Sequence, residues 1–85
     1  MTWDETIVLF RTNKKHSKAV DYFDASIGYA EVYQWSRAVY SAEIAERTLN
    51  EAIEYAEGCN GCDVVVDSMK SLLSKVQSHI RGWGA

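Results

Sequence analysis

The pair Cys59 and Cys62, in the sequence Cys-Asn-Gly-Cys, has the residue types and spacing that point most directly to chemistry in this chain. Two thiolates at this spacing can hold a metal ion, and a CxxC pair at a helix start can be redox-active because the helix dipole favours the thiolate. A structural zinc site needs four ligands, and the other candidates are His16 and His79. In a helical final segment His79 lies about 25 Å along the helix from Cys62, which is too far for a closed site.

We therefore predict neither a metal centre nor a cofactor, and keep Cys59 and Cys62 only as weak metal candidates. Their simplest interpretation is a pair of small, partly buried loop residues. Two alternatives stay open. One is a metal site in a symmetric dimer that brings four cysteines together, and the other is a thiol-redox role, although a thioredoxin-like site occurs in a βαβ context. The sequence contains no Gly-rich phosphate loop, nucleophile elbow or His-Glu-x-x-His motif. We expect a protein that is not an enzyme and has no catalytic residues.

A basic cluster lies near the amino terminus, with no acidic residue inside it. Its members are Arg11, Lys14, Lys15, His16 and Lys18. Such a patch can grip phosphates, so its arginine and lysines define an alternative function, that of a small nucleic-acid-associated regulator. A solvated loop, or a docking site for the acidic part of another copy, is the simpler interpretation.

An acidic run occupies the second half of the chain, where Arg47 is the one basic residue between Glu43 and Asp67. Its candidate acidic surface consists of Glu43, Glu46, Glu51, Glu54 and Glu57. This surface can meet a basic partner or imitate a phosphate backbone, although acidic helix faces are usually only solvated.

Aromatic residues crowd the middle of the chain, and we take five of them as candidate partner-binding residues. They are Tyr22, Tyr29, Tyr33, Trp35 and Tyr40. Together with the neighbouring apolar stripe they occupy more of a helix circumference than one buried face requires. Tyrosine and tryptophan also dominate binding hot spots. An interface is therefore expected here, with packing against the first helix as the alternative.

The composition favours helices, because proline is absent and only five glycines occur. Thr2 to Glu5 has the Ser/Thr-x-x-Glu form of a capping box, which predicts a first helix at about residues 3–11. The segment 12–17 is polar throughout and predicts a connection between helices.

From residue 17 to residue 57 no residue forces a helix to stop, so a long helix is predicted there. A kink or break is expected near 26–28, since glycine weakens a helix interior and serine competes for backbone hydrogen bonds. The glycines at 58 and 61 predict the next turn, and a final helix is expected over residues 63–81.

Two apolar seams predict how these helices pack. The first contains Trp35, Ala38, Ala42, Ala45, Leu49, Ala52 and Ala56, and the second contains Val65, Met69, Leu72, Val76, Ile80 and Trp83. The first is rich in alanine, so the partner helix can approach closely. The sequence thus predicts an all-α single domain over residues 1–85: a short first helix, and a long helix paired with the last in an antiparallel hairpin.

The overall composition limits the possible partners. The formal net charge is −3, so any attraction to nucleic acid must be local, and no apolar run is long enough to cross a bilayer. We expect a cytoplasmic protein. We also expect it to form a homodimer or higher oligomer, because the long helix has a larger apolar surface than its short neighbours can cover. In size and composition the chain resembles the small acidic inhibitor and accessory proteins of phages and other mobile elements. That resemblance implies a non-enzymatic module that docks on a larger protein complex.

Overall fold

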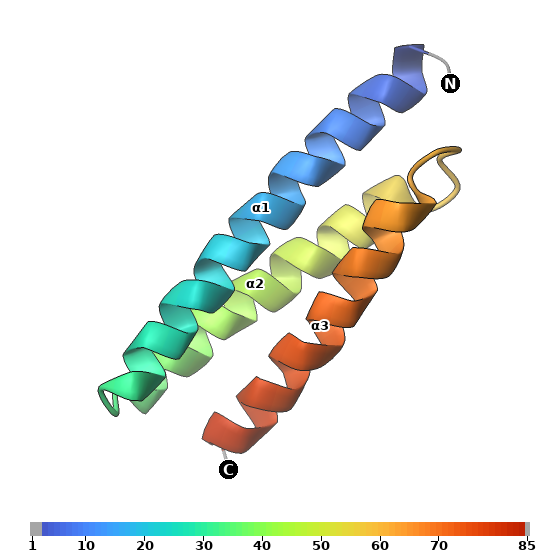
Figure 1. The fold of residues 1–85 in the computed structure, drawn as a ribbon. Helices are drawn as coiled ribbons and strands as arrows, with labels where there is room; N and C mark the ends of the chain where they lie inside the picture. Colours follow the sequence, from blue (N-terminus) through green and yellow to red (C-terminus); the bar gives the residue numbers. More distant parts are fainter. Residues whose placement is uncertain (1–2, 85) are drawn as a thin grey trace.

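The computed structural model describes residues 3–84 and folds them into three helices (Figure 1). These are α1 (Trp3–Glu31), α2 (Trp35–Ala56) and α3 (Asp63–Gly84). The predicted small all-α bundle is confirmed, and its last helix ends at Gly84 rather than near residue 81. The predicted capping role of Thr2 lies outside the described residues.

The first helix is much longer than predicted, and the connection expected at 12–17 is wrong. α1 runs through this segment without interruption. The segment contains neither glycine nor proline, so its polar residues disfavour a helix only weakly. Thr12 at the start of the segment and Ala19 just after its end are completely buried. Packing of this face therefore outweighs the low local propensity.

The break predicted near 26–28 is also wrong, because the chain turns at 32–34 instead. Ser26 is completely buried, and its hydroxyl donates a hydrogen bond to the Phe23 carbonyl at 2.6 Å, so the serine is satisfied inside the helix. Gly28 is exposed within α1. One exposed glycine costs a helix only about 1 kcal/mol, which the packing of the long α1 outweighs.

α1 ends in a Schellman motif, in which Tyr33 holds the place that glycine usually occupies. The N–H of Gln34 donates to the Tyr29 carbonyl at 2.9 Å, and the N–H of Tyr33 donates to the Ala30 carbonyl at 3.0 Å. Tyr33 has a φ of 62°, in the left-handed region that side chains disfavour. The usual sequence signal for such a turn is therefore missing at this position.

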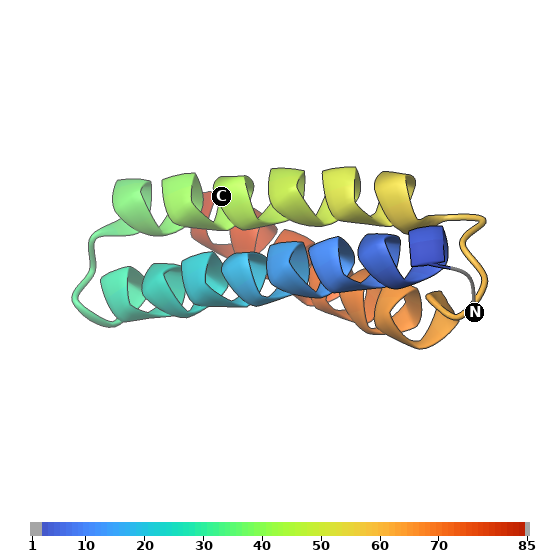
Figure 2. The same cartoon turned by 90° about the horizontal axis from the view of Figure 1, so that it is seen from above.

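α2 is the central helix, because both other helices pack against it while α1 and α3 touch each other little. Figure 2 shows α1 and α2 side by side, with α3 crossing behind them at an angle. The predicted seam of α2 forms the core from Ala38 to Ala56, whereas Trp35 at its start is exposed. α3 contributes chiefly Val65, Met69 and Val76.

The three helices form a rod with extents of 47 × 17 × 15 Å. The turn between α1 and α2 lies at one end, together with the C-terminal end of α3 (Figure 1). The loop between α2 and α3 lies at the other end, beside the start of α1. Of the helices described here, none has the length and hydrophobicity needed to span a membrane.

Candidate functional site

Large apolar side chains are exposed around the turn between α1 and α2. Tyr33 exposes 78% of its surface, Tyr40 69%, Val32 60% and Trp35 45%. Trp83, near the end of α3, is half-buried beside them. We call these five residues the aromatic end. Isolated exposed apolar residues are common on proteins, whereas several large ones close together are less usual.

The aromatic end has a defined shape. The Tyr33 and Trp35 rings pack edge to face, with their centroids 6.0 Å apart and their planes at 67°. Trp35, Val39 and Tyr40 of α2 line one side of an open hollow of about 490 Å³, and Trp83 of α3 lines the other. The surface therefore runs from the tip of the rod onto the side where α2 and α3 meet.

The five aromatic residues singled out by the sequence do not form one surface. Tyr33, Trp35 and Tyr40 belong to the aromatic end, whereas Tyr22 is half-buried and packs against the core. Tyr29 is also half-buried, and the Arg37 guanidinium lies 6.0 Å from the centre of its ring. Sequence reasoning missed Val32, because exposure near the end of a helix depends on where the chain turns. It assigned Trp83 to the buried face of the last helix, and Trp83 does pack against the core while it also lines the hollow.

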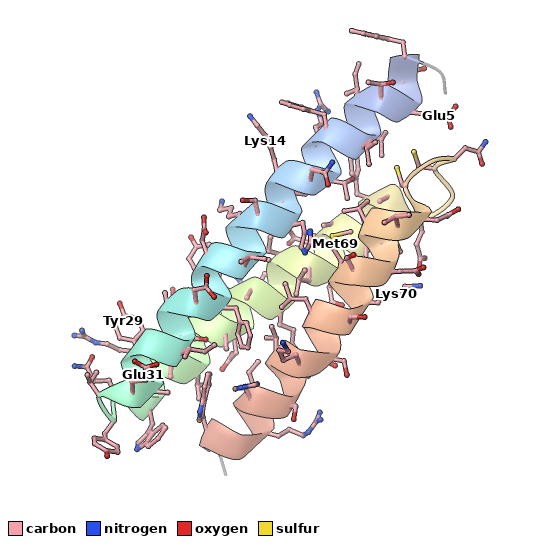
Figure 3. The ribbon with its side chains drawn as sticks, in the orientation of Figure 1. Glu5, Lys14, Tyr29, Glu31, Met69 and Lys70 are labelled. Atoms are coloured by element: carbon pink, nitrogen blue, oxygen red, sulfur yellow. The ribbon has the colours of Figure 1, made fainter. Side chains whose placement is uncertain are left out.

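The basic cluster lies on a helix rather than on the predicted loop. Its arginine and three lysines follow the spacing i, i+3, i+4 and i+7, which places them on one face of α1. We call Arg11, Lys14, Lys15 and Lys18 the basic stripe. The Lys14 ammonium lies 5.1 Å from the centre of the exposed Phe10 ring. Figure 3 shows Lys14 pointing away from the other two helices. His16 is half-buried and lies off this stripe, in a hollow between α1 and α3.

The acidic surface follows α2, with every glutamate exposed except Glu46, which is half-buried. Glu57 pairs with Lys70 of α3 at 3.3 Å between two exposed side chains, which contributes little to stability. Within residues 3–84, the ion pairs include none between the basic stripe and this acidic surface.

The two cysteines lie in the loop between α2 and α3. Their Sγ atoms are 2.7 Å apart, and no disulfide joins them. Cys62 is buried, and this burial, with the adjacent Cys59 thiol and then the carboxylates of Asp63 and Glu5, raises the pKa of its thiol from 9.0 to about 11. In the described part of the chain, no three histidine, cysteine or acidic residues are close enough to hold one metal ion.

Comparison with known proteins found no family model, no curated protein and no solved structure that matches this chain. The function must therefore be argued from the residues and surfaces of the chain itself.

Proposed function

We propose that this chain is a non-enzymatic protein–protein interaction module that docks on another protein through its aromatic end. The observation that carries the proposal is Tyr33, which combines a left-handed backbone with a ring that is 78% exposed. A non-glycine residue in this conformation costs about 1–2 kcal/mol. Within the chain the ring contacts Trp35 edge to face, but most of its surface stays exposed, so contact with a partner is the best account of a tyrosine here.

The neighbours of Tyr33 support the same function. Trp35 and Tyr40 are residue types that combine a large contact area with few rotatable bonds, so they lose little entropy when a partner orders them. The contact between Tyr33 and Trp35 already holds both rings in a defined orientation. A partly preorganised surface binds more tightly than a mobile one of the same composition.

The shape of the rod indicates what the partner surface looks like. A tip with a cross-section of 17 × 15 Å cannot by itself supply the roughly 800 Å² that a stable interface buries on each side. Insertion of the tip into a concave apolar site would also bury the hollow between α2 and α3. We therefore propose a larger partner with such a concavity, as a small inhibitor or accessory protein would need, rather than flat contact with a second copy.

The proposal is tested by comparing variants in capture from the native host. Tyr33→Ala and Tyr40→Ala should each weaken retention of the partner about 30-fold, as hot-spot residues do, with unchanged helical circular dichroism. Tyr55→Ala on α2 is the matched control, because Tyr55 is also exposed but lies toward the other end of the helix. Equal retention by all three variants would contradict the proposal.

A second candidate, nucleic-acid binding, rests on the basic stripe. Continuous helix through residues 12–17 aligns four cations on one face, next to the exposed Phe10 ring. A helix of this kind can lie along a phosphate backbone. The matching test is the salt dependence of binding to duplex DNA.

If all four cations neutralise phosphates, log affinity should fall with log salt at a slope of about −3 to −4. Lys14→Gln with Lys18→Gln should reduce that slope by about 2, and the control pair Lys75→Gln with Arg81→Gln on α3 should leave it unchanged. No binding at low salt would remove this candidate.

A further inference from the structure

The loop between α2 and α3 folds so that Cys59 and Cys62 meet. The N–H of Cys62 donates to the Cys59 carbonyl at 3.3 Å, which closes a four-residue turn with Gly61 in its third position. Gly61 has a φ of 87°, the positive value that a type II turn requires there. Further hydrogen bonds tie the turn to the helices on both sides, from Cys59 to the Ala56 carbonyl and from Val66 to the Cys62 carbonyl. The cysteines are therefore positioned by backbone structure.

The distance between the sulfurs is closer to a covalent bond than to a contact between unbonded atoms. At 2.7 Å, the two Sγ atoms need to approach by only about 0.7 Å to reach the disulfide bond length of roughly 2.05 Å. A turn that holds two thiols so near each other has already lost most of the conformational freedom that disulfide formation would remove.

We propose that Cys59 and Cys62 are a redox-active dithiol that closes reversibly to an intrachain disulfide by exchange with a small disulfide such as glutathione disulfide. The Cys59 thiolate attacks one sulfur of glutathione disulfide, forming a mixed disulfide and releasing one glutathione. Cys62 then gives its proton to solvent and attacks the Cys59 sulfur, which releases the second glutathione. The protein loses two protons and two electrons, and one glutathione disulfide becomes two glutathiones.

Burial assigns the order of these two attacks. Cys59 is partly accessible, whereas Cys62 exposes 1% of its surface and packs in the core cluster. The raised pKa of Cys62 also keeps its thiol protonated at neutral pH, and only a thiolate attacks a disulfide. Cys59 is therefore the attacking residue and Cys62 the resolving residue, which lies next to the sulfur that it attacks once its proton is lost.

Neither redox state of the pair places a charge on Cys62 near neutral pH. Burial first, then the Cys59 thiol and the carboxylates of Asp63 and Glu5, disfavours a thiolate at Cys62. A disulfide is also uncharged, so it fits this partly buried site without an ionisation penalty.

The test is a titration of the protein in buffers with different ratios of reduced to oxidised glutathione. Free thiols are trapped with iodoacetamide, and the products are separated by mass. The wild-type protein should convert between a doubly alkylated form and an unalkylated form about 2 Da lighter than the dithiol, with little glutathione adduct. Disulfide-linked dimers, stable glutathione adducts on the wild-type chain, or full alkylation at every ratio would each overturn the proposal.

Two variants test the order of attack. Cys62→Ser should accumulate one glutathione adduct on Cys59, because the resolving thiol is gone. Cys59→Ser should react with glutathione disulfide at least about tenfold more slowly than Cys62→Ser does, since Cys62 is buried and protonated. Equal rates for the two variants would contradict the assigned order, and circular dichroism checks that both remain helical. The wild-type titration tests the disulfide independently of either variant.

Discussion

At Tyr33, the backbone conformation and the identity of the side chain favour different residues. The left-handed φ of 62° suits glycine, yet the chain has a tyrosine whose ring faces solvent. Proteins commonly retain such locally unfavourable residues where binding requires them. The contrast makes Tyr33 the residue at which stability and binding separate most clearly.

Replacing Tyr33 with glycine should stabilise the fold and weaken partner binding. The expected gain is about 1 kcal/mol in the free energy of unfolding, measured by urea denaturation, because glycine adopts positive φ without strain. Tyr33→Ala is the matched control, since alanine removes the ring but keeps the strained backbone. Should Tyr33→Ala stabilise the protein as much as Tyr33→Gly does, backbone strain at this position is not the reason.

The raised pKa of the Cys62 thiol predicts that the folded protein loses stability at high pH. Its pKa is near 11 in the folded protein and 9.0 when unperturbed, so the unfolded chain releases this proton first as the pH rises. The contribution of this pKa difference to the free energy of unfolding is fully present below pH 9 and is lost between about pH 9 and pH 11.

Urea denaturation under reducing conditions at several pH values in this range measures the effect. Cys62→Ala cannot ionise at this position, so its stability should fall less steeply with pH than that of the wild-type protein. Parallel curves for the two proteins would show that the Cys62 thiol does not carry this dependence.

At the scale of elements, α3 and the seam and C-terminal end of α2 could be predicted, whereas the extent of α1 and the start of α2 could not. The alanine seam of α2 and the apolar face of α3 depend on spacing, which sequence displays directly. In α1, the weak segment 12–17 is helical because Thr12 packs in the interior, and sequence does not show which residues a neighbour will cover. Likewise, no glycine marks the turn at Tyr33, so Gly28 became the expected break.

For the candidate site, the sequence shows the residue types but not which of them are exposed. Aromatic residue types identified the region, but their exposure depends on where α1 ends and on how the ends of α2 and α3 meet. Tyr22 therefore packs against the core, whereas Tyr33 and Tyr40 are at the surface. The basic stripe needed the continuity of α1 to become one surface, since a loop would have scattered its charges.

Gly28→Ala should stabilise α1 by about 1 kcal/mol, because alanine is the better helix former. Apart from the neighbouring residues and the local helix backbone, nothing lies within 4 Å of the Cβ that alanine would add, so no steric penalty offsets the gain. Gly58→Ala provides the contrasting control, since the φ of 86° at Gly58 makes alanine strained and destabilising there. Thermal and urea unfolding of both variants measure the difference, and a destabilising Gly28→Ala would mean that this part of α1 is not a regular helix.

At the scale of the whole molecule, the aromatic end, the cysteine loop and the two charged surfaces lie on different parts of the rod. The aromatic end occupies one tip, and the cysteine loop lies at the opposite tip. The basic stripe and the acidic surface follow α1 and α2 between them. A partner bound at the aromatic end would leave the cysteine loop accessible, so binding and thiol exchange can be measured independently on the same protein.

The most direct measurement is site-specific photocrosslinking of the protein in its native host. A photoreactive phenylalanine analogue is placed at Tyr33, at Tyr40, or at the control Val64, which is 81% exposed in the first turn of α3 at the other end of the rod. Our account predicts one discrete crosslinked partner from positions 33 and 40 and none from position 64. Crosslinking of that partner from position 64 alone, or no discrete product from positions 33 and 40, would contradict the assignment of the aromatic end as the binding surface.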